Sequence, residues 1–240
     1  MHYFSSALVI ALASCLHSAT GFGFSILAVP LLLLLHDPLT AVQINLIIAV
    51  VLSVAMVPRV RGDVDYTLLK RLVLSGLVGV PLGMALILYV RPVQLKLIIA
   101  VLTLVFLAVL LMQVRFERNR SRDAMCGALA GAFTSAVGMG GVPLLVYFAG
   151  ARLPKAVVRA TVVAFFVFAY GLSLAMQLWS AHGSGRVIWF SLSLVPVALL
   201  GVACGNWLFV RISQRAFRLF IYAVLGSNSA FLLWSLRGAF

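Results

Sequence analysis

The stretch TGFGFSILAVPLLLLL at residues 20–35 and the stretch AVGMGGVPLLVYFAG at residues 136–150 follow one pattern. Each has a glycine-rich break and then a short apolar run, and Pro30 in the first lies opposite Pro143 in the second. Glycine lets the backbone turn sharply and lets another group approach it closely. A helix needs about 20 apolar residues to cross the hydrocarbon core of a bilayer, and neither run is that long. We therefore predict that each break divides a broken or re-entrant helical hairpin.

Apolar segments account for most of the chain on both sides of these breaks. They lie at 3–20, 24–35, 39–57, 67–89, 93–113, 122–138, 141–150, 154–179, 186–209 and 215–237. The two segments around each break form the predicted hairpins, and the other six are long enough for full spans. The sequence thus predicts an all-α polytopic membrane protein, with one hairpin and three full transmembrane helices in each half.

The composition also favours a membrane protein. Hydrophobic residues make up 64% of the chain and charged residues 10%, whereas a soluble domain has about 25% charged residues to hydrate its surface. No polar block is long enough for a separate soluble domain, so we predict a single membrane domain over residues 1–240. The formal charge of +13 does not indicate nucleic-acid binding, because the basic residues lie at the ends of apolar segments. Three cysteines without short spacing argue against a disulfide framework or a zinc site.

The two halves resemble each other beyond the breaks. Three further pairs recur in the same order: Thr40-Ala-Val with Lys155-Ala-Val, GVPLG at 79–83 with GVACG at 201–205, and LKLIIAVL at 95–102 with FRLFIYAV at 217–224. Matches in a common order indicate a duplication. We predict a first repeat at 1–113, a cytosolic basic linker at 114–123 and a second repeat at 124–240. Close helix packing is the expected role of five glycines in these halves, namely Gly76, Gly79, Gly83, Gly201 and Gly205.

The orientation is predicted from Lys and Arg in short loops, which concentrate on the cytosolic side. Cytosolic placement of 58–71, the linker, 151–159 and 211–218 puts fourteen of the eighteen basic residues inside. The four left outside are Arg91, Lys96, Arg186 and Arg237. Equivalent loops of the two halves then lie on opposite sides of the membrane, which requires an odd number of crossings in each repeat. The repeats are therefore predicted to be inverted, with both chain ends outside.

Inverted repeats favour transport. Rocking one repeat against the other exposes a midplane site to each side in turn, and paired discontinuous helices indicate where that site is. Cation-coupled carriers commonly place Asp or Glu inside the membrane, but here all five carboxylates lie in loops or at segment ends: Asp37, Asp63, Asp65, Glu117 and Asp123. Free N–H groups at broken helices bind anions. We therefore predict a small anionic substrate, with no cofactor and no metal.

The candidate substrate-binding residues flank the breaks or lie shortly after the start of the next long segment. They are Thr20, Gly21, Gly23, Ser25, Pro30, Gln43, Asn45, Thr134, Ser135, Gly138, Gly140, Gly141, Pro143, Arg159 and Thr161. His17, four residues before the first break, is a candidate for proton coupling because histidine titrates near neutral pH.

Each of these assignments has an alternative. His17 can be a neutral side chain hydrogen-bonded between helices, and Arg159 can extend to the cytosolic headgroups. Hydroxyls in membrane helices often bond their own backbone, and the break glycines can serve packing alone.

The two break motifs, together with His36-Asp-Pro, Ala41-Val, Lys155-Ala-Val and Arg159-Ala-Thr161, resemble the TauE/SafE sulfite exporter family. The resemblance covers nearly the whole chain, and many similar proteins are named probable membrane transporter protein. It implies a multi-pass protein of the bacterial cytoplasmic (inner) membrane that exports or imports a sulfur-containing anion such as sulfite or an organosulfonate. The first motif departs from the glycine-richer family form at Phe22 and Phe24, so the resemblance does not identify the ligand.

The leading hypothesis is a secondary carrier, with the lipid bilayer and the anion as its partners and self-association into a homo-oligomer left open. The alternatives are an anion channel and a membrane assembly subunit. A membrane-embedded enzyme is disfavoured, because the segments hold no carboxylate pair, His/Cys cluster or Ser/His/Asp set.

Overall fold

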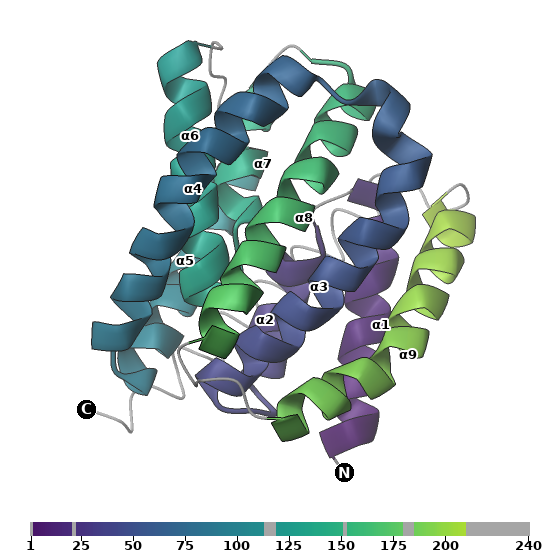
Figure 1. Ribbon diagram of the computed structural model, residues 1–240. Coiled ribbons are helices and arrows are strands. Elements are labelled where there is room, and N and C mark those ends of the chain that lie inside the picture. The colour runs from purple at the N-terminus through teal and green to yellow at the C-terminus, as the bar shows by residue number, and fades with distance from the viewer. Residues whose placement is uncertain (1, 21–22, 113–118, 151–152, 180–184, 210–240) are drawn as a thin grey trace.

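The protein is a bundle of α-helices in the computed structural model, which describes residues 2–20, 23–112, 119–150, 153–179 and 185–209 (Figure 1). The helices are α1 (His2–Thr20), α2 (Gly23–Leu32), α3 (Pro38–Val60), α4 (Tyr66–Tyr89), α5 (Pro92–Met112), α6 (Arg120–Val137), α7 (Gly141–Gly150), α8 (Lys155–Trp179) and α9 (Gly185–Phe209), with a short 3-10 turn, η1 (Arg61–Asp63), after α3. These ranges contain no β-strand. The all-α class is confirmed, and the helix bounds lie within a few residues of the predicted segments.

Four of the described helices are long and apolar enough to cross a bilayer. Their spans are Pro38–Asp63, Tyr66–Ile87, Lys155–Trp179 and Gly185–Gly205. They correspond to four of the six predicted full spans; the predicted segment 93–113 forms α5, and 215–237 lies outside the described residues. Trp179 and Trp189 are 93% and 76% exposed, as expected of tryptophans at a membrane interface. The chain is therefore a multi-pass membrane protein.

Each short helix folds back along the helix before it. Near the start of α1, Ser6 Oγ lies 2.8 Å from Nε2 of His36, which follows α2. In the second pair, the hydroxyl of Tyr147 in α7 donates a 2.7 Å hydrogen bond to Oδ1 of Asp123 in the first turn of α6. In each pair, the start of the first helix and the end of the second helix thus lie at the same end of the bundle. For α1 and α2 this is the end that holds the N-terminus, and for α6 and α7 it is the opposite end (Figure 1).

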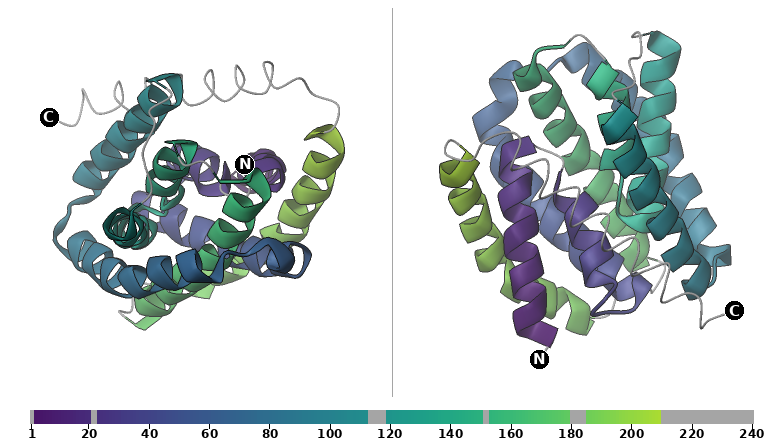
Figure 2. Two further views of the ribbon diagram at one scale, coloured as in Figure 1. Left: turned by 90° about the horizontal axis from the view of Figure 1, so that it is seen from above. Right: turned by 180° about the vertical axis from the view of Figure 1, so that it is seen from behind.

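The long helices of the two halves pack against each other in pairs. α4 lies along α6, α1 lies along α9, and α3 and α8 contact each other between these pairs (Figures 1 and 2). Glycines allow this close approach. A Cβ at Gly79 would overlap the carbonyl oxygen of Ala128, and a Cβ at Gly201 would lie 2.6 Å from that of Ala11. The prediction that such glycines serve helix packing is confirmed.

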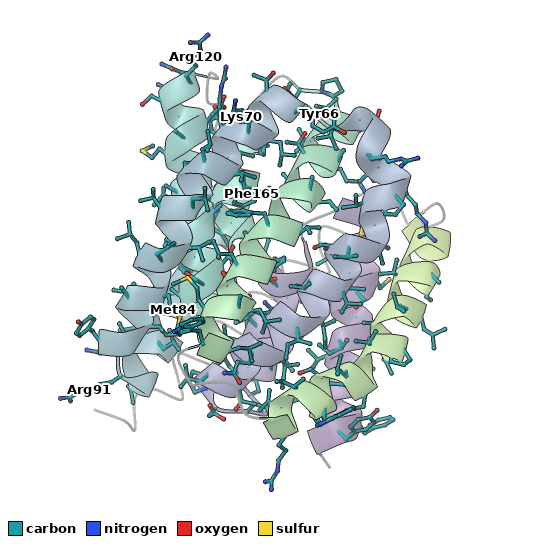
Figure 3. All side chains as sticks on the ribbon, viewed as in Figure 1. Tyr66, Lys70, Met84, Arg91, Arg120 and Phe165 are labelled. Atoms are coloured by element: carbon teal, nitrogen blue, oxygen red, sulfur yellow. The ribbon has the colours of Figure 1, made fainter. Side chains whose placement is uncertain are left out.

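Charged side chains gather at one end of the bundle. Lys70 and Arg120 lie there, whereas Arg91 lies at the opposite end (Figure 3). The buried carboxylate of Asp123, which is 1% exposed, forms a 2.9 Å ion pair with Arg71 at the same end. This pair joins the second turn of α4 to the first turn of α6. The N-terminal ends of these two helices, which are rich in basic residues, therefore lie together.

Asp37 begins α3 at the other end. Its side chain accepts a hydrogen bond from the backbone N–H of Thr40 and caps the helix. Partial burial acts to raise the pKa of Asp37, but its hydrogen bonds, chiefly to Thr40, hold the pKa below its usual value.

Candidate functional site

At the first break, α8 reaches across to the end of α1. The guanidinium of Arg159, in the second turn of α8, donates from Nη2 to the backbone carbonyl of Ser18 at 2.9 Å. Ser18 lies in the last turn of α1, where carbonyl groups have no partner within the helix. The side chain of Arg159 is therefore directed at the break, and it joins residues 141 positions apart in the sequence.

His17 lies beside this contact in the protein interior. Its side chain is 1% exposed, its ring meets that of Phe24 edge-on with centroids 6.1 Å apart, and Arg159 is within electrostatic range. In the part of the chain that the structure describes, neither ring nitrogen of His17 has a hydrogen-bond partner, and neither does Nε of Arg159. Buried polar atoms are normally hydrogen-bonded, so these three atoms are candidate contacts for a small polar ligand.

The second break is shaped by Gly138, which follows α6 with φ 71° and ψ 5°. This left-handed conformation strains any residue with a Cβ. The carbonyl of Gly138 accepts a 3.1 Å hydrogen bond from Nδ2 of Asn45 in α3. A Cβ on Gly138 would lie 2.9 Å from that nitrogen and 3.2 Å from a methyl group of Val29. Both conformation and space therefore require glycine here.

The two breaks lie near each other. Val29, against Gly138, is five residues along α2 from Phe24, which is about 8 Å in a helix, and Phe24 meets His17 at the first break. α2 and α7, the short helices behind the two breaks, also contact each other. Asn45 of the first half and Arg159 of the second half thus each bind the break of the opposite half.

The hydroxyls predicted at the site all have protein partners where they are described. Thr134 Oγ1 donates to the carbonyl of Ala130, and Ser135 Oγ donates to that of Val80 in α4. Ser25 Oγ lies 2.8 Å from the hydroxyl of Tyr170. The hydroxyls of Ser135 and Ser25 thus connect the break regions to α4 and α8, whereas that of Thr134 bonds its own helix.

The remaining residues predicted to bind substrate lie in several different parts of the structure. Thr161 accepts a hydrogen bond from the backbone N–H of Asp65, the residue that caps α4. Gln43 is 6% exposed, and the carbonyl of Pro143 accepts from Sγ of Cys126. Gly23, Pro30, Gly140 and Gly141 belong to the hairpins themselves, Thr20 ends α1, and Gly21 lies outside the described residues.

Two further polar residues near the breaks were not predicted. Tyr170 is 1% exposed and contacts Ser25, and Nε2 of Gln177 lies 3.4 Å from the carbonyl oxygen of Ser135. Both lie on α8, and with Ser173 they form a polar series at intervals of three and four residues. That interval places the three side chains on one helix face. The helical spacing of polar residues in this segment could therefore have identified them from the sequence.

The groups at the first break can donate hydrogen bonds to an anion. A guanidinium and an imidazole lie at the first break, and no described carboxylate lies within ion-pair distance of Arg159. Within the described ranges no three His, Cys, Asp or Glu side chains are grouped so as to hold a metal ion.

The family model described as Sulfite exporter TauE/SafE matches residues 6–232, nearly the whole chain. No curated protein and no solved structure matches the chain.

Proposed function

Because the chain belongs to the sulfite exporter TauE/SafE family of membrane transporters, we propose that it is a secondary carrier for a small sulfur-containing anion. Sulfite and the organosulfonates are the leading substrates. The site lies between the two breaks, with Arg159 as the main anion-binding residue and His17 beside it. This family membership confirms the resemblance seen in the break motifs.

Arg159 carries the proposal. The Arg159 side chain is half-buried, with its Nε shielded from water. Loss of hydration favours a counter-charge, and the ion pair found in the described ranges joins Arg71 to Asp123 instead. The guanidinium has Nη2 on the carbonyl of Ser18, which is a neutral acceptor, and its Nε has no partner among the described groups. A sulfite or sulfonate group has three oxygen atoms that accept hydrogen bonds. Such an anion would neutralise Arg159 and would accept hydrogen bonds from its Nε and from a ring N–H of His17.

Matching contacts support inverted repeats. Gly79 and Gly83 of α4 lie against Ala128 and Ala132 of α6, and Gly201 and Gly205 of α9 lie against Ala11 and Cys15 of α1. The two glycine pairs are 122 residues apart, and the two sets of partners are 117 residues apart. A duplicated unit whose first and fourth helices pack across the halves would produce this agreement.

The directions in which α1 and α6 run along the bundle support the inversion of the two repeats. α1 starts at the end that holds the N-terminus, whereas α6 starts beside Arg120 at the opposite end (Figures 1 and 3). The α1–α2 hairpin would then re-enter from one side and the α6–α7 hairpin from the other, with both breaks meeting near the midplane. Half-helix termini at a midplane site are typical of carriers that work by alternating access.

The charge distribution supports the orientation. The end with Lys70, Arg71 and Arg120 would face the cytosol, and both chain ends would face the opposite side of the bacterial inner membrane. The proposed arrangement contains one membrane domain over residues 1–240, with the basic linker 114–123 in the cytosol.

The test is transport by the purified protein in liposomes. Uptake of sulfite, thiosulfate, sulfoacetate, sulfate and small carboxylates would be measured with and without a pH gradient. We expect saturable uptake that is accelerated by unlabelled substrate on the opposite side. Arg159→Gln should lower uptake at least about tenfold, and Arg159→Lys should restore it only in part, because the ammonium lacks the planar fork of donors.

Arg186→Gln is the matched control, since Arg186 is exposed at the start of α9. Uptake by Arg159→Gln at the wild-type level would place the anion elsewhere. A persistent single-channel conductance would identify a channel, and no flux of any tested solute would favour an assembly subunit.

A further inference from the structure

A groove lies between α3 and α9. Its volume is about 490 Å³, and it is lined by Leu52, Ala55, Met56, Arg59, Leu199, Val202 and Ala203. Arg59 is the charged member of this lining. It lies in the last turn of α3 and is exposed.

The apolar lining runs from Arg59 into the bundle. Leu52, Met56 and Arg59 are spaced by four and three residues, so they share one face of α3. Arg59 is seven residues from Leu52, and the groove therefore descends about 10 Å along α3 from the guanidinium. Arg59 is at the same end of the bundle as η1 and the start of α4, where the basic side chains gather.

We propose that this groove binds one anionic phospholipid, with its phosphate on Arg59 and an acyl chain along Leu52, Met56 and the facing residues of α9. The groove complements an anionic phospholipid, because a cation lies at one end for the headgroup and apolar side chains line the rest for an acyl chain. No described carboxylate pairs with Arg59, so its charge is open to a lipid phosphate. Guanidinium groups bind phosphate through two parallel hydrogen bonds, and basic residues at a membrane surface attract anionic lipids.

The small residues Ala55 and Ala203 are exposed on the facing helices. They leave the groove open where a larger side chain on either helix would fill it. An acyl chain needs such a continuous apolar channel, whereas a free inorganic anion does not.

The test uses the full-length protein in detergent. It would be titrated with phosphatidylglycerol and with phosphatidylcholine, and native mass spectrometry would measure the lipid-bound fraction. We expect tighter binding of phosphatidylglycerol, weakened roughly fivefold by Arg59→Gln. The matched control is Arg61→Gln, because Arg61 lies two residues on in η1 and does not line the groove.

Ala203→Leu is a second variant that leaves the charge in place and fills the apolar part of the groove. It should also weaken phosphatidylglycerol binding. If Arg59→Gln fails to insert into the membrane, the binding measured for Ala203→Leu still tests the proposal. Equal binding of the two lipids, equal loss in Arg59→Gln and Arg61→Gln, or unchanged binding in Ala203→Leu would each overturn the proposal. These measurements require no transport, so they are independent of the proposed function.

Discussion

The side-chain amide of Asn45 donates a 3.1 Å hydrogen bond to the carbonyl of Gly138, which lies 93 residues later in the chain. Arg159 makes the corresponding contact in the other direction, with the carbonyl of Ser18. In both cases a long helix of one half holds the point where a helix of the other half is interrupted. Movement of one half against the other would change both contacts, which connects them to the proposed alternating access.

Asn45→Ala should destabilise the protein. It leaves the carbonyl of Gly138 buried without its side-chain donor, and the expected cost is about 1–3 kcal/mol in the free energy of unfolding. Thermal unfolding in detergent would measure the loss, with Ser193→Ala as a control because Ser193 is exposed and its hydroxyl bonds the carbonyl of Phe190 in its own helix. Equal melting temperatures of Asn45→Ala and wild type would show that the bond to Gly138 contributes nothing.

Gly138→Ala should reduce both stability and uptake. The left-handed conformation costs a residue with a Cβ about 1–2 kcal/mol, and the new Cβ would press on Asn45 at 2.9 Å. Gly62→Ala is the control, since a Cβ there meets no atom within 4 Å. A Gly138→Ala protein with wild-type uptake and stability would contradict the proposed geometry of the second break.

Gly79→Ala and Gly201→Ala should both destabilise the protein. Each places a methyl group against the backbone of the facing helix, and overpacking of this kind costs about 1–3 kcal/mol. Gly171→Ala is the matched control, because it lies in α8 with open space around it and gains about 0.5–1 kcal/mol from helix propensity. A large loss in one variant and none in the other would argue against equivalent packing in the two halves.

Tyr147→Phe should loosen the second hairpin. The Tyr147 hydroxyl donates to the buried carboxylate of Asp123 at 2.7 Å, and a hydrogen bond to a charged group contributes about 1.5–3 kcal/mol. Hydrogen exchange in α7 would increase, whereas Tyr66→Phe should leave it unchanged because Tyr66 is 69% exposed. Unaltered exchange in Tyr147→Phe would show that Asp123 finds equivalent partners without the hydroxyl.

His17→Asn should remove the effect of a pH gradient on uptake if His17 carries the coupled proton. Asparagine retains a polar group at the buried position but does not titrate. Initial uptake rates at several imposed gradients would be compared with those of His36→Asn, where the histidine lies after α2 beside Ser6. A full response to the gradient in His17→Asn would assign proton coupling to another group or to none.

Much of the architecture could be predicted from local sequence. The apolar lengths of α3, α4, α8 and α9 place them across a bilayer, because a helix buried in lipid satisfies its own backbone hydrogen bonds. The interruptions before α2 and α7 were also predictable, since glycine at Gly138 and Gly140 marks a point where the chain turns. The role of Gly79 and Gly201 followed from their small size in apolar helices.

The partners of the polar residues could not be predicted in this way. Thr134 and Ser135, chosen because they flank a break, bond backbone carbonyls, whereas Tyr170 was overlooked and lies against Ser25. Which face of a helix meets which neighbour depends on its rotation and crossing angle, and these follow from the packing of all the side chains together.

The sequence by itself thus determined that this is a helical membrane protein of a transporter family, with interruptions near Gly23 and Gly141. Hydropathy, charge and glycine content act over a few neighbouring residues, so they can be read along the chain. Only the tertiary structure decided that Asn45 binds Gly138 and that Arg159 binds Ser18 beside His17. Those contacts join residues 93 and 141 positions apart, and they exist only once α3 and α8 have packed against the two hairpins.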